Sequence, residues 1–294
     1  MPFNNINLLS HHHLEQAEHA RLLTSFYTGP LHALRSQMPS SLQVIPLRGL
    51  PLISPGDKLA EMIVQAASRL RVGVKNRDIF VIGQKAVSKS EGELVDISNL
   101  KPSPRAIELA KKGGRSAAFI DLVLRNTSKV VRADKTALIV RTRQGWTCLN
   151  AGVDKSNVKG ASTFTLLPRD PDASARKLRS SIRGMTGKNI GVIITDTHSR
   201  PFRLGQVEET IGIAGISPFI DYRGSKDLFG YELRFKNVAV ADELAGAAEL
   251  VMGQGREATP AAIVRGLRRV RFQDRARSSA LVVSRREDLF RGTL

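Results

Sequence analysis

From Leu42 onward, short apolar runs alternate with segments whose apolar residues recur at helical spacing. The runs DIFVIG (78–83) and GVII (191–194) are rich in apolar and β-branched residues, which indicates buried strands. The segment LQVIPLRGLPLI (42–53) is predicted to be a strand followed by a turn. A polar loop, QKAVSKSEG (84–92), is expected after DIFVIG. No fixed repeat period and no proline- or serine-rich linker interrupts the alternation. The pattern predicts a mixed α and β fold of the α+β class.

Three helices have recognisable ends. One begins near Asp57, the predicted N-cap, and runs to Leu70. A second starts at Ser103-Pro104, where the proline suits the first helical position, and stops at Gly113-Gly114. The third covers residues 171–187. Apolar faces are predicted from Leu59, Met62, Ile63, Ala66, Ala67 and Leu70 in the first helix, and from Ala175, Leu178, Ile182 and Met185 in the third.

Residues 1–41 differ from the rest of the chain and are predicted to form an accessory arm. They contain three consecutive histidines, His11–His13, and a short amphipathic pattern from Leu14 to Phe26. Residues 42–294 are expected to form one domain, with room for two subdomains. Its later part, residues 234–266, has the pattern of a strand, a helix, a glycine-rich turn and another strand.

The composition is that of a globular protein, since 41% of the 294 residues are hydrophobic and 24% are charged. No run of about 18 or more apolar residues and no signal-peptide pattern is present, so we expect a cytoplasmic protein without membrane contact. The single cysteine, Cys148, excludes a disulfide or a thiolate metal site within one chain. We expect it to be buried in a structural role.

The formal net charge of +18 attracts anionic partners. Nucleic acid, nucleotides and polycarboxylates are all candidates on charge alone. Aromatic residues make up only 5% of the chain, the basic residues are spread along it, and no zinc-finger spacing or clear helix-turn-helix is found. Nucleic acid is therefore the less favoured partner. An anionic small molecule fits better, and a generally basic surface is the plainer alternative.

Three polar loops follow apolar segments and carry oxygen ligands. They contain Asp154 and Asn157 in NAGVDKSN, Asp196 and Thr197 in TDTHSR, and Gln254 between glycines in MGQG. Carboxylate, hydroxyl and amide oxygens suit Mg²⁺ and Mn²⁺, which complete their coordination with substrate phosphates. Each loop alone is more simply explained by capping or turn formation. Together they predict a site for a metal-bound nucleotide.

Cations suited to phosphates and carboxylates stand near these loops. Lys85 and Lys89 follow one predicted strand, and Arg200 and Arg203 follow another. For each of them, simple exposure to solvent is the alternative. The chain has no P-loop, because GMTGKNIG lacks the required spacing and the hydroxyl after its lysine. The G-x-S-x-G, H-E-x-x-H and kinase motifs are also missing from the sequence. A bound nucleotide would therefore need an uncommon scaffold.

Seven segments occur in a fixed order: RGLPLISPGD, VSKSEG, NAGVDKSNV, LPRDPDASARKLR, GVIITDTHSRPFRLGQ, ADELAGAAELVMGQG and PAAIVRGL. Together they resemble the coenzyme F420-0:L-glutamate ligase family, the γ-glutamyl ligases of deazaflavin coenzyme biosynthesis. The resemblance runs from about Leu42 to Arg268, and several separate matches in order make it specific. It implies a mixed α/β fold peculiar to that family and an intertwined homodimer. It also implies GTP, two Mg²⁺ or Mn²⁺ ions and often K⁺.

The resemblance also assigns roles to residues. It implies that Asp154 and Asp196 bind one ion and that Thr197 and Gln254 bind the other, while Lys89 neutralises phosphate charge. The implied nucleotide contacts are Leu50, Pro51, Leu52, Ile53, Gln84, Lys85, Lys89, Asn157, Met252, Gly253, Gln254, Gly255, Arg256, Glu257, Ala258 and Thr259.

The implied reaction joins L-glutamate to an anionic small-molecule acceptor, the deazaflavin coenzyme precursor. Transfer of the γ-phosphoryl group of GTP activates the acceptor carboxylate as an acyl phosphate, and the glutamate amine then displaces phosphate. Arg200 and Arg203 are our own assignment, made from adjacency alone, as groups that bind the carboxylates of the acceptor or of glutamate.

Some positions depart from the family pattern. Ser199 stands where a glycine is usual, Gln84-Lys85 replaces smaller hydroxyl residues, and Glu208 and Glu209 replace more apolar ones. Together with the extra N-terminal arm and the high basicity, these departures keep an alternative open, a paralogue that adds glutamate to a different acceptor such as another polyglutamylated cofactor. A third alternative is a relative that binds nucleotide without catalysis, and a fourth is a basic nucleic-acid-binding protein.

Overall fold

The structure is a computed structural model that describes residues 41–284 and 286–288. The predicted accessory arm, with its histidine triplet and short helix, lies outside these residues except for Ser41. Residues 42–294 belong to one unit of the chain. Among the described residues, no helix is long and apolar enough to cross a membrane.

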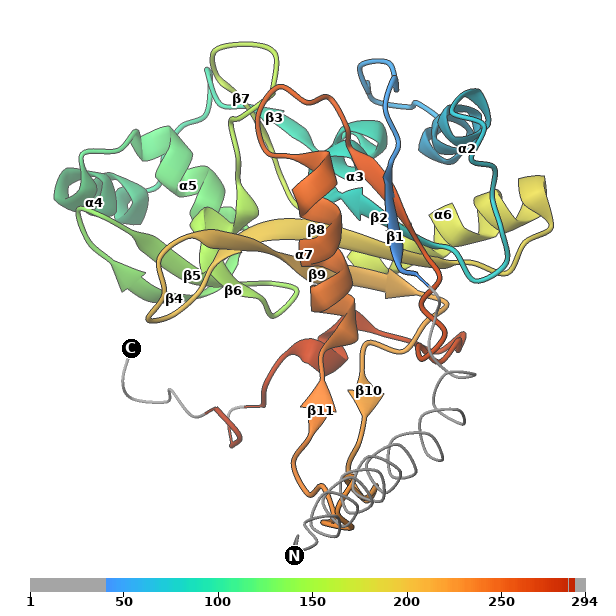
Figure 1. Cartoon of the computed structure of the whole chain (residues 1–294). Coiled ribbons are helices and arrows are strands. Elements are labelled where there is room, and N and C mark those ends of the chain that lie inside the picture. Colours follow the sequence, from blue (N-terminus) through green and yellow to red (C-terminus); the bar gives the residue numbers. More distant parts are fainter. Residues whose placement is uncertain (1–40, 285, 289–294) are drawn as a thin grey trace, which may run out of the picture. The chain divides into compact units, whose positions relative to one another are not determined.

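A five-stranded sheet with the order β1-β12-β2-β8-β9 forms the centre of this unit (Figure 1). β2 and β8 run parallel, and the other neighbouring strands are antiparallel. The mixed α and β class predicted from the sequence is therefore confirmed. The strands are β1 (Gln43–Pro46), β2 (Ile79–Gly83), β8 (Gly191–Ser199), β9 (Gln206–Ala214) and β12 (Ala261–Arg265).

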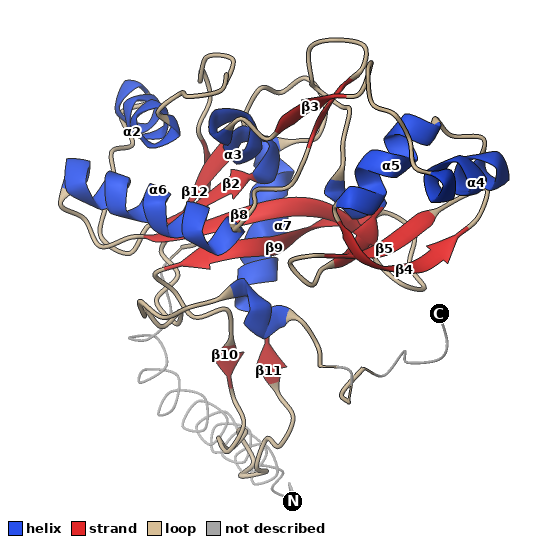
Figure 2. Ribbon diagram, turned by 180° about the vertical axis from the view of Figure 1, so that it is seen from behind, coloured by secondary structure: helices blue, strands red, loops and turns tan. Residues whose placement is uncertain are grey.

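Helices cover both faces of this sheet, as the views from opposite sides show (Figures 1 and 2). Phe80 and Ile82 of β2 belong to the core beneath α2, α3 and α6, whereas Ile79 and Val81 belong to the core beneath α7. Burial on both faces explains why β2 is apolar throughout. The helices are α2 (Leu59–Arg69), α3 (Gln84–Glu91), α6 (Pro171–Thr186) and α7 (Val240–Met252).

A smaller lobe beside the sheet has its own apolar core (Figure 1). It contains α4 (Pro104–Gly113), α5 (Ala117–Arg125) and a sheet of β4 (Thr127–Ala133), β5 (Leu138–Thr142) and β6 (Thr147–Leu149). Two short strand pairs complete the unit, β3 (Leu94–Asp96) with β7 (Thr163–Thr165) and β10 (Ile220–Asp221) with β11 (Asn237–Val238). The 3₁₀ turns are η1 (Asn150–Gly152) and η2 (Ser278–Leu281).

The predicted helix ends are largely confirmed. Ser103 caps α4, because its Oγ accepts a hydrogen bond from the backbone N–H of Ala106 at 3.3 Å. The prediction for Asp57 is wrong: its carboxylate accepts from the N–H of Ser54 at 2.7 Å, and Lys58 is the residue that precedes α2. The carboxylate therefore closes a turn before the helix rather than capping the helix itself.

Two other local predictions are also wrong. The expected polar loop 84–92 is mostly the helix α3. Its apolar residues Ala86 and Val87 are buried in the core, and the lysines lie outside that core. Met185 and Leu70 were predicted to belong to the apolar helix faces but are 45% and 40% exposed. Met185 lies in the last turn of α6 and Leu70 follows the last residue of α2, where the chain leaves the core.

Candidate functional site

A cavity of about 690 Å³ lies at the polar ends of β2 and β8. It is lined by residues from segments 50–53, 83–89, 148–157, 195–208 and 249–260. Every nucleotide contact and metal ligand implied by the resemblance is among these lining residues. The chain therefore brings together segments that are far apart in the sequence. The parallel pairing of β2 with β8 places two of them, around Gly83 and Thr195, at the same edge of the sheet.

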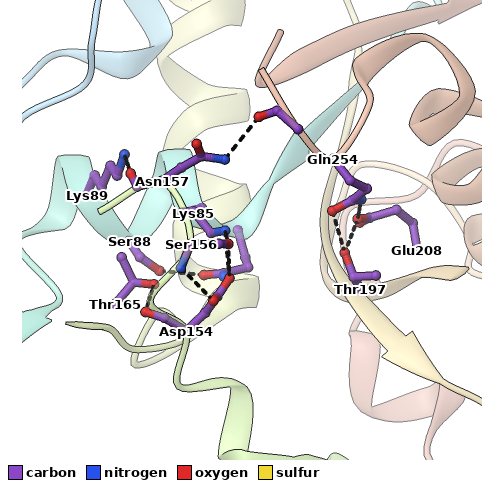
Figure 3. Close-up of polar contacts among 12 residues, drawn as sticks. Lys85, Ser88, Lys89, Asp154, Ser156, Asn157, Thr165, Thr197, Glu208 and Gln254 are labelled. Atoms are coloured by element: carbon purple, nitrogen blue, oxygen red, sulfur yellow. Dashed lines mark hydrogen bonds and ion pairs between the residues drawn. The ribbon is translucent and has the colours of Figure 1, made fainter. Parts of the chain in front are cut away.

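α3 carries Lys85 and Lys89 into the cavity (Figure 3). These lysines are four positions apart, so they lie on the same face of the helix. The Nζ of Lys85 lies 2.6 Å from Oδ2 of Asp154, and the Nζ of Lys89 donates to the carbonyl oxygen of Asn157 at 2.7 Å. Burial, followed by the charge of Lys85, lowers the pKa of Lys89. Two cations are thus held side by side at a partly buried wall.

Asp154 is fixed by its backbone and its side chain. Its N–H and C=O pair with Thr165 at 3.1 and 2.9 Å. Its carboxylate accepts from the N–H and the hydroxyl of Ser156 at 2.8 and 2.7 Å. Burial alone would raise the pKa of Asp154, but the hydrogen bonds from Lys85 and Ser156 outweigh it and lower the pKa. The carboxylate is therefore ionised and aimed at the cavity wall that carries the lysines.

The loop after α7 closes the cavity from another side. Gly253 has φ 70° and ψ 173°, a conformation that is practically restricted to glycine. A Cβ at this position would also overlap the side chain of Glu257, which accepts from the N–H of Gly255 at 2.7 Å. The Nδ2 of Asn157 donates to the carbonyl oxygen of Gly255 at 3.2 Å. The loop is thus tied both to itself and to the segment that carries Asp154.

Asp196 and His198 lie two residues apart on β8 and therefore share one face of the strand. His198 is only 5% exposed, and its ring nitrogens lie 3.1 Å from Asp196 Oδ2 and 2.9 Å from Glu209 Oε2. Burial opposes the charged form, but the hydrogen bonds with the two carboxylates prevail and raise the pKa of His198 to about 10. The imidazolium therefore holds one oxygen of Asp196 in place.

The opposite face of β8 carries Thr197, which pairs across the strands with Glu208 of β9. The Oγ1 of Thr197 donates to Oε1 of Glu208 at 2.7 Å and lies 3.2 Å from Oε1 of Gln254 (Figure 3). The Nε2 of Gln254 donates to Glu208 Oε1 at 2.8 Å and to Glu249 Oε1 at 3.0 Å. Burial, with a smaller contribution from the charge of Asp196, raises the pKa of Glu208.

The oxygens at this cavity form a mixed donor set of carboxylates, a hydroxyl and an amide. Over residues 41–284 and 286–288, no group of three or more histidine, cysteine, aspartate or glutamate side chains is arranged as a metal site. The predicted set does not need such a group, because threonine and glutamine supply two of its four ligands. Hard cations such as Mg²⁺ accept this kind of oxygen set and take remaining ligands from phosphate and water.

The arginines proposed from adjacency are not placed at the cavity wall. Neither Arg200 nor Arg203 is among the lining residues, although Ser199, which precedes them, is. Arg203 is exposed, whereas Arg200 is partly buried and its Nε has no hydrogen-bond partner among the described residues. Ser199 ends β8 without a positive φ, so this position does not require glycine here.

Cys148 is free and buried, as expected, and it also lines the cavity. Burial, together with the nearby negative charge of Asp196, raises the pKa of its thiol to about 12. The thiol is therefore protonated at neutral pH and acts as a small apolar part of the wall.

Sequence reasoning missed several residues that shape the site. Glu208 was noted only as a departure from a family pattern, and no role was assigned to Glu249, His198 or Ser156. Alternation along a strand shows which residues share a face, but only the register of β8 with β9 shows that Glu208 lies opposite Thr197. Glu249 lies in the last turn of α7, and Gln254 lies in the loop after this helix. The sequence indicated where the helix stops, but not that these two side chains meet.

Known proteins resemble this chain over most of its length. A family described as F420-0:Gamma-glutamyl ligase matches residues 49–266 of the chain. The coenzyme F420:L-glutamate ligase of Methanothermobacter thermautotrophicus is 40% identical over 251 residues, which cover 85% of this chain and 99% of that protein. The enzyme of the same name from Archaeoglobus fulgidus is 45% identical over 226 residues, which cover 77% of this chain and 88% of that protein.

The chain belongs to the F420-0:γ-glutamyl ligase family. Members of this family are ligases, so the cavity is the candidate active site of a ligase. A third relative, the coenzyme F420:L-glutamate ligase of Methanopyrus kandleri, is 42% identical over 81% of this chain and 93% of its own length. The match to the family begins at residue 49 and thus includes the cavity segment that starts at Leu50.

Proposed function

We propose that the protein uses GTP to form an amide bond between a carboxylate of coenzyme F420-0 and the amine of L-glutamate. Membership of the ligase family and the names of its relatives support the choice of substrates. The observation that carries the proposal is the convergence of two lysines, two aspartates, a threonine and a glutamine on one cavity, from segments far apart in the chain.

The proposed chemistry has two steps. A carboxylate oxygen of the acceptor attacks the γ-phosphorus of GTP, the bond to the β-phosphate oxygen breaks, and GDP leaves. The glutamate amine then attacks the acyl carbon, a C–N bond forms, the C–O bond to phosphate breaks, and inorganic phosphate and a proton are released. Activation is needed because an ionised carboxylate does not react with an amine in water.

The residues at the cavity suit a nucleoside triphosphate. Lys85 and Lys89 provide positive charge for the oxygens of its polyphosphate. The loop from Gly253 to Thr259 offers backbone groups that can approach a ligand closely, since its first residue has no side chain. The segment 50–53, which includes the 92% exposed Leu52, provides an apolar surface for the base or ribose.

The oxygen donors also fit the two divalent cations of the proposal. Asp154 and Asp196 would hold one ion, and Thr197 and Gln254 the other. Glu208 Oε2 and Thr195 Oγ1 are buried side by side at the same cavity, and neither makes a hydrogen bond of good geometry among the described residues. Both oxygens are therefore available as ligands. Bound Mg²⁺ or Mn²⁺ would offset the negative charge that develops during phosphoryl transfer. To bind an ion, Asp154 would first have to release its contact with Lys85.

Arg200 and Arg203, which follow the cavity residue Ser199 in the sequence, remain our candidates for binding substrate carboxylates. Arg200 is the better supported of the two, because its Nε has no hydrogen-bond partner in the part of the chain that the structure describes. The acceptor and glutamate both carry carboxylates, and a planar guanidinium binds a carboxylate through two parallel hydrogen bonds. The proposal also includes activation by K⁺. The ligation rate should then be higher in KCl than in NaCl.

The proposed homodimer would bury an apolar surface that the single chain exposes. The segment between β10 and β11 has Leu228, Phe229, Tyr231 and Phe235 exposed by 85%, 96%, 62% and 89%. Large apolar side chains gathered on one projecting segment are typical of protein–protein contacts. A second copy of this chain is the partner we propose for them.

The test is a ligation assay with GTP, Mn²⁺, L-glutamate and coenzyme F420-0, read by mass spectrometry. We expect products heavier by one glutamyl unit and stoichiometric GDP and phosphate. Parallel reactions with ATP and with other polyglutamylated cofactors as acceptors separate the alternatives. Glutamylation of another acceptor, with none of coenzyme F420-0, would contradict the proposed substrate. Nucleotide hydrolysis without any product would contradict ligation.

Two variants link the assay to the cavity. Asp196→Asn and Asp154→Asn should each lower the ligation rate by at least about a hundredfold, because each removes a carboxylate proposed to bind metal. Asp274→Asn is the matched control, since Asp274 lies away from the cavity and pairs with Arg179 at 2.8 Å. Because Asp196 also holds the buried His198, circular dichroism must show that its variant is folded. Full activity in both variants would refute the proposed site.

A further inference from the structure

The second proposed cation has two neutral ligands, Thr197 and Gln254, whereas the first has two carboxylates. A divalent ion is bound more tightly as the number of charged ligands rises. The structure places a third oxygen group at the same spot. Glu208 stands opposite Thr197 in the register of β8 and β9, so its carboxylate lies on the same face of the sheet.

Glu208 is 7% exposed and lines the cavity. Its Oε1 accepts from Thr197 Oγ1 at 2.7 Å and from Gln254 Nε2 at 2.8 Å. Its Oε2 is buried, and no group in the described part of the chain makes a hydrogen bond of good geometry to it. The nearby hydroxyl of Thr195 opposes, without cancelling, the rise in pKa that burial of Glu208 causes, and its Oγ1 is likewise left without such a bond. A buried carboxylate oxygen without a partner is costly, and natural proteins keep one where a ligand or ion satisfies it.

Gln254 is held in one orientation. Its Nε2 donates to Oε1 of Glu208 at 2.8 Å and to Oε1 of Glu249 at 3.0 Å. An ionised carboxylate can only accept hydrogen bonds, so the amide nitrogen of Gln254, and not its oxygen, must face Glu208 and Glu249. Its Oε1 consequently faces Thr197, whose Oγ1 lies 3.2 Å away (Figure 3).

We propose that Glu208 is the anionic ligand of the cation held by Thr197 and Gln254, and that Glu249 is a positioning residue that orients Gln254. This inference rests on the proposed function, which supplies the cation. Oε1 of Glu208 is occupied by the hydrogen bonds from Thr197 and Gln254, so Oε2 is the oxygen that the cation would take.

A purely structural role for Glu208 makes a different prediction from a ligand role. If the carboxylate only tied Thr197 to Gln254, its replacement by glutamine would destabilise the protein whether or not metal is present. If it binds the cation, Glu208→Gln removes a buried, half-satisfied charge. The metal-free protein should then melt at the same or a higher temperature, while the stabilisation by metal is lost.

The experiment measures Mn²⁺ binding to the full chain with guanosine 5′-(β,γ-imido)triphosphate, with free Mn²⁺ determined by electron paramagnetic resonance. Wild type should bind two ions. In Glu208→Gln the affinity for one ion should fall at least tenfold while the other ion is retained, and Glu208→Asp should lie between. Glu249→Gln should weaken the same ion by roughly threefold. Glu243→Gln, an exposed acid on the same helix α7, is the control and should match wild type.

Each result decides the matter. If Glu208→Gln binds two ions with wild-type affinity, the ligand role is wrong, and the proposed function stands provided that wild type still ligates glutamate. If Glu208→Gln loses as much melting temperature without Mn²⁺ as with it, the residue is structural and the inference is overturned. If wild type with nucleotide binds no Mn²⁺ at all, both the inference and the proposed metal-dependent function fall.

Discussion

The Nζ of Lys85 and the Oδ2 of Asp154 lie 2.6 Å apart at the wall of the cavity. One is a proposed phosphate-binding cation and the other a proposed metal ligand, so each neutralises the other. A metal-bound nucleotide would separate the two charges, because the phosphates attract the lysine and the ion attracts the carboxylate. The contact thus keeps both groups ordered in position until the substrate binds.

Replacement of Lys85 by methionine tests this arrangement. Both side chains are partly exposed, at 26% and 41%, so the ion pair itself contributes little to stability. We expect Lys85→Met to change the melting temperature slightly and to weaken GTP binding at least tenfold, which corresponds to about 1.4 kcal/mol. Calorimetric titration of GTP in the presence of Mg²⁺ measures this affinity.

The control for that variant is Lys58→Met. Lys58 also pairs with a carboxylate, Glu61 at 3.3 Å, but it lies on the surface and does not line the cavity. GTP affinity should be unchanged in this variant. Equal losses in the two variants would mean that net charge, and not the position of Lys85, determines binding.

Much of the fold follows from local sequence signals. Runs of apolar residues predicted the strand DIFVIG and the strand that ends in TDTHS. Proline and glycine predicted the boundaries of α4 at Ser103 and Gly114, because both residues restrict or free the backbone where they stand. The α3 helix was missed because its polar composition resembles a loop. Its one-turn spacing of Lys85 and Lys89 was the available signal, and it also explains why both lysines face the cavity.

The composition of the site was less predictable than the location of its motifs. Asp154, Asp196 and Gln254, in polar loops that follow apolar segments, suggested oxygen ligands, and the family resemblance connected them. The role of Glu208 depends on which residue of β9 stands opposite Thr197, and a register shift between Ile194 and Thr195 decides that pairing. Such an irregularity leaves no mark in a single sequence.

Asp121 gives a test of stability against pH in the smaller lobe. It is 3% exposed and accepts from the N–H of Ser103 at 2.9 Å and from Arg125 Nε at 2.7 Å. Burial alone would raise the pKa of Asp121, but these hydrogen bonds outweigh it and lower the pKa. Its stabilising contribution is therefore present above the unfolded-state pKa of about 3.9 and is lost as the pH falls toward the lower folded-state value.

Asp121→Asn should consequently lower the free energy of unfolding by about 1–3 kcal/mol at pH 7, and the difference from wild type should shrink as the pH falls below about 4. Thermal unfolding followed from pH 7 to pH 3 measures the difference. Glu108→Gln, which removes an exposed acid from α4 paired with Lys112, should have no measurable effect at any of these pH values. A constant difference between Asp121→Asn and wild type would show that the carboxylate does not titrate differently on folding.

The apolar segment between β10 and β11 predicts the oligomeric state. Replacing Phe229 and Phe235, which are 96% and 89% exposed, by glutamate should weaken the proposed homodimer at least tenfold, since charges would have to be buried at the contact. Light scattering coupled to size-exclusion chromatography over a range of concentrations detects the shift to monomer. Leu250→Glu alters an equally exposed leucine on α7 and should leave the dimer intact. A monomeric wild type would remove the partner proposed for this surface.

Two glycines seven residues apart should respond to alanine in opposite ways. Gly246 lies inside α7, and a Cβ there would meet nothing within 4 Å. Gly246→Ala should therefore raise the free energy of unfolding by about 0.5–1 kcal/mol, since alanine favours the helix. Gly253, after the end of α7, has φ 70° and ψ 173°, and a Cβ there would overlap Glu257.

Gly253→Ala should cost roughly 1–3 kcal/mol of strain, or displace the loop that carries Gln254. In either case GTP and Mn²⁺ should bind more weakly, because Gln254 Oε1 is set by the path of this loop. Thermal melts and nucleotide titrations of the two variants separate a general effect of alanine from a specific effect on the site. Unchanged binding in Gly253→Ala would mean that the loop tolerates a side chain there and that its backbone does not closely approach the nucleotide.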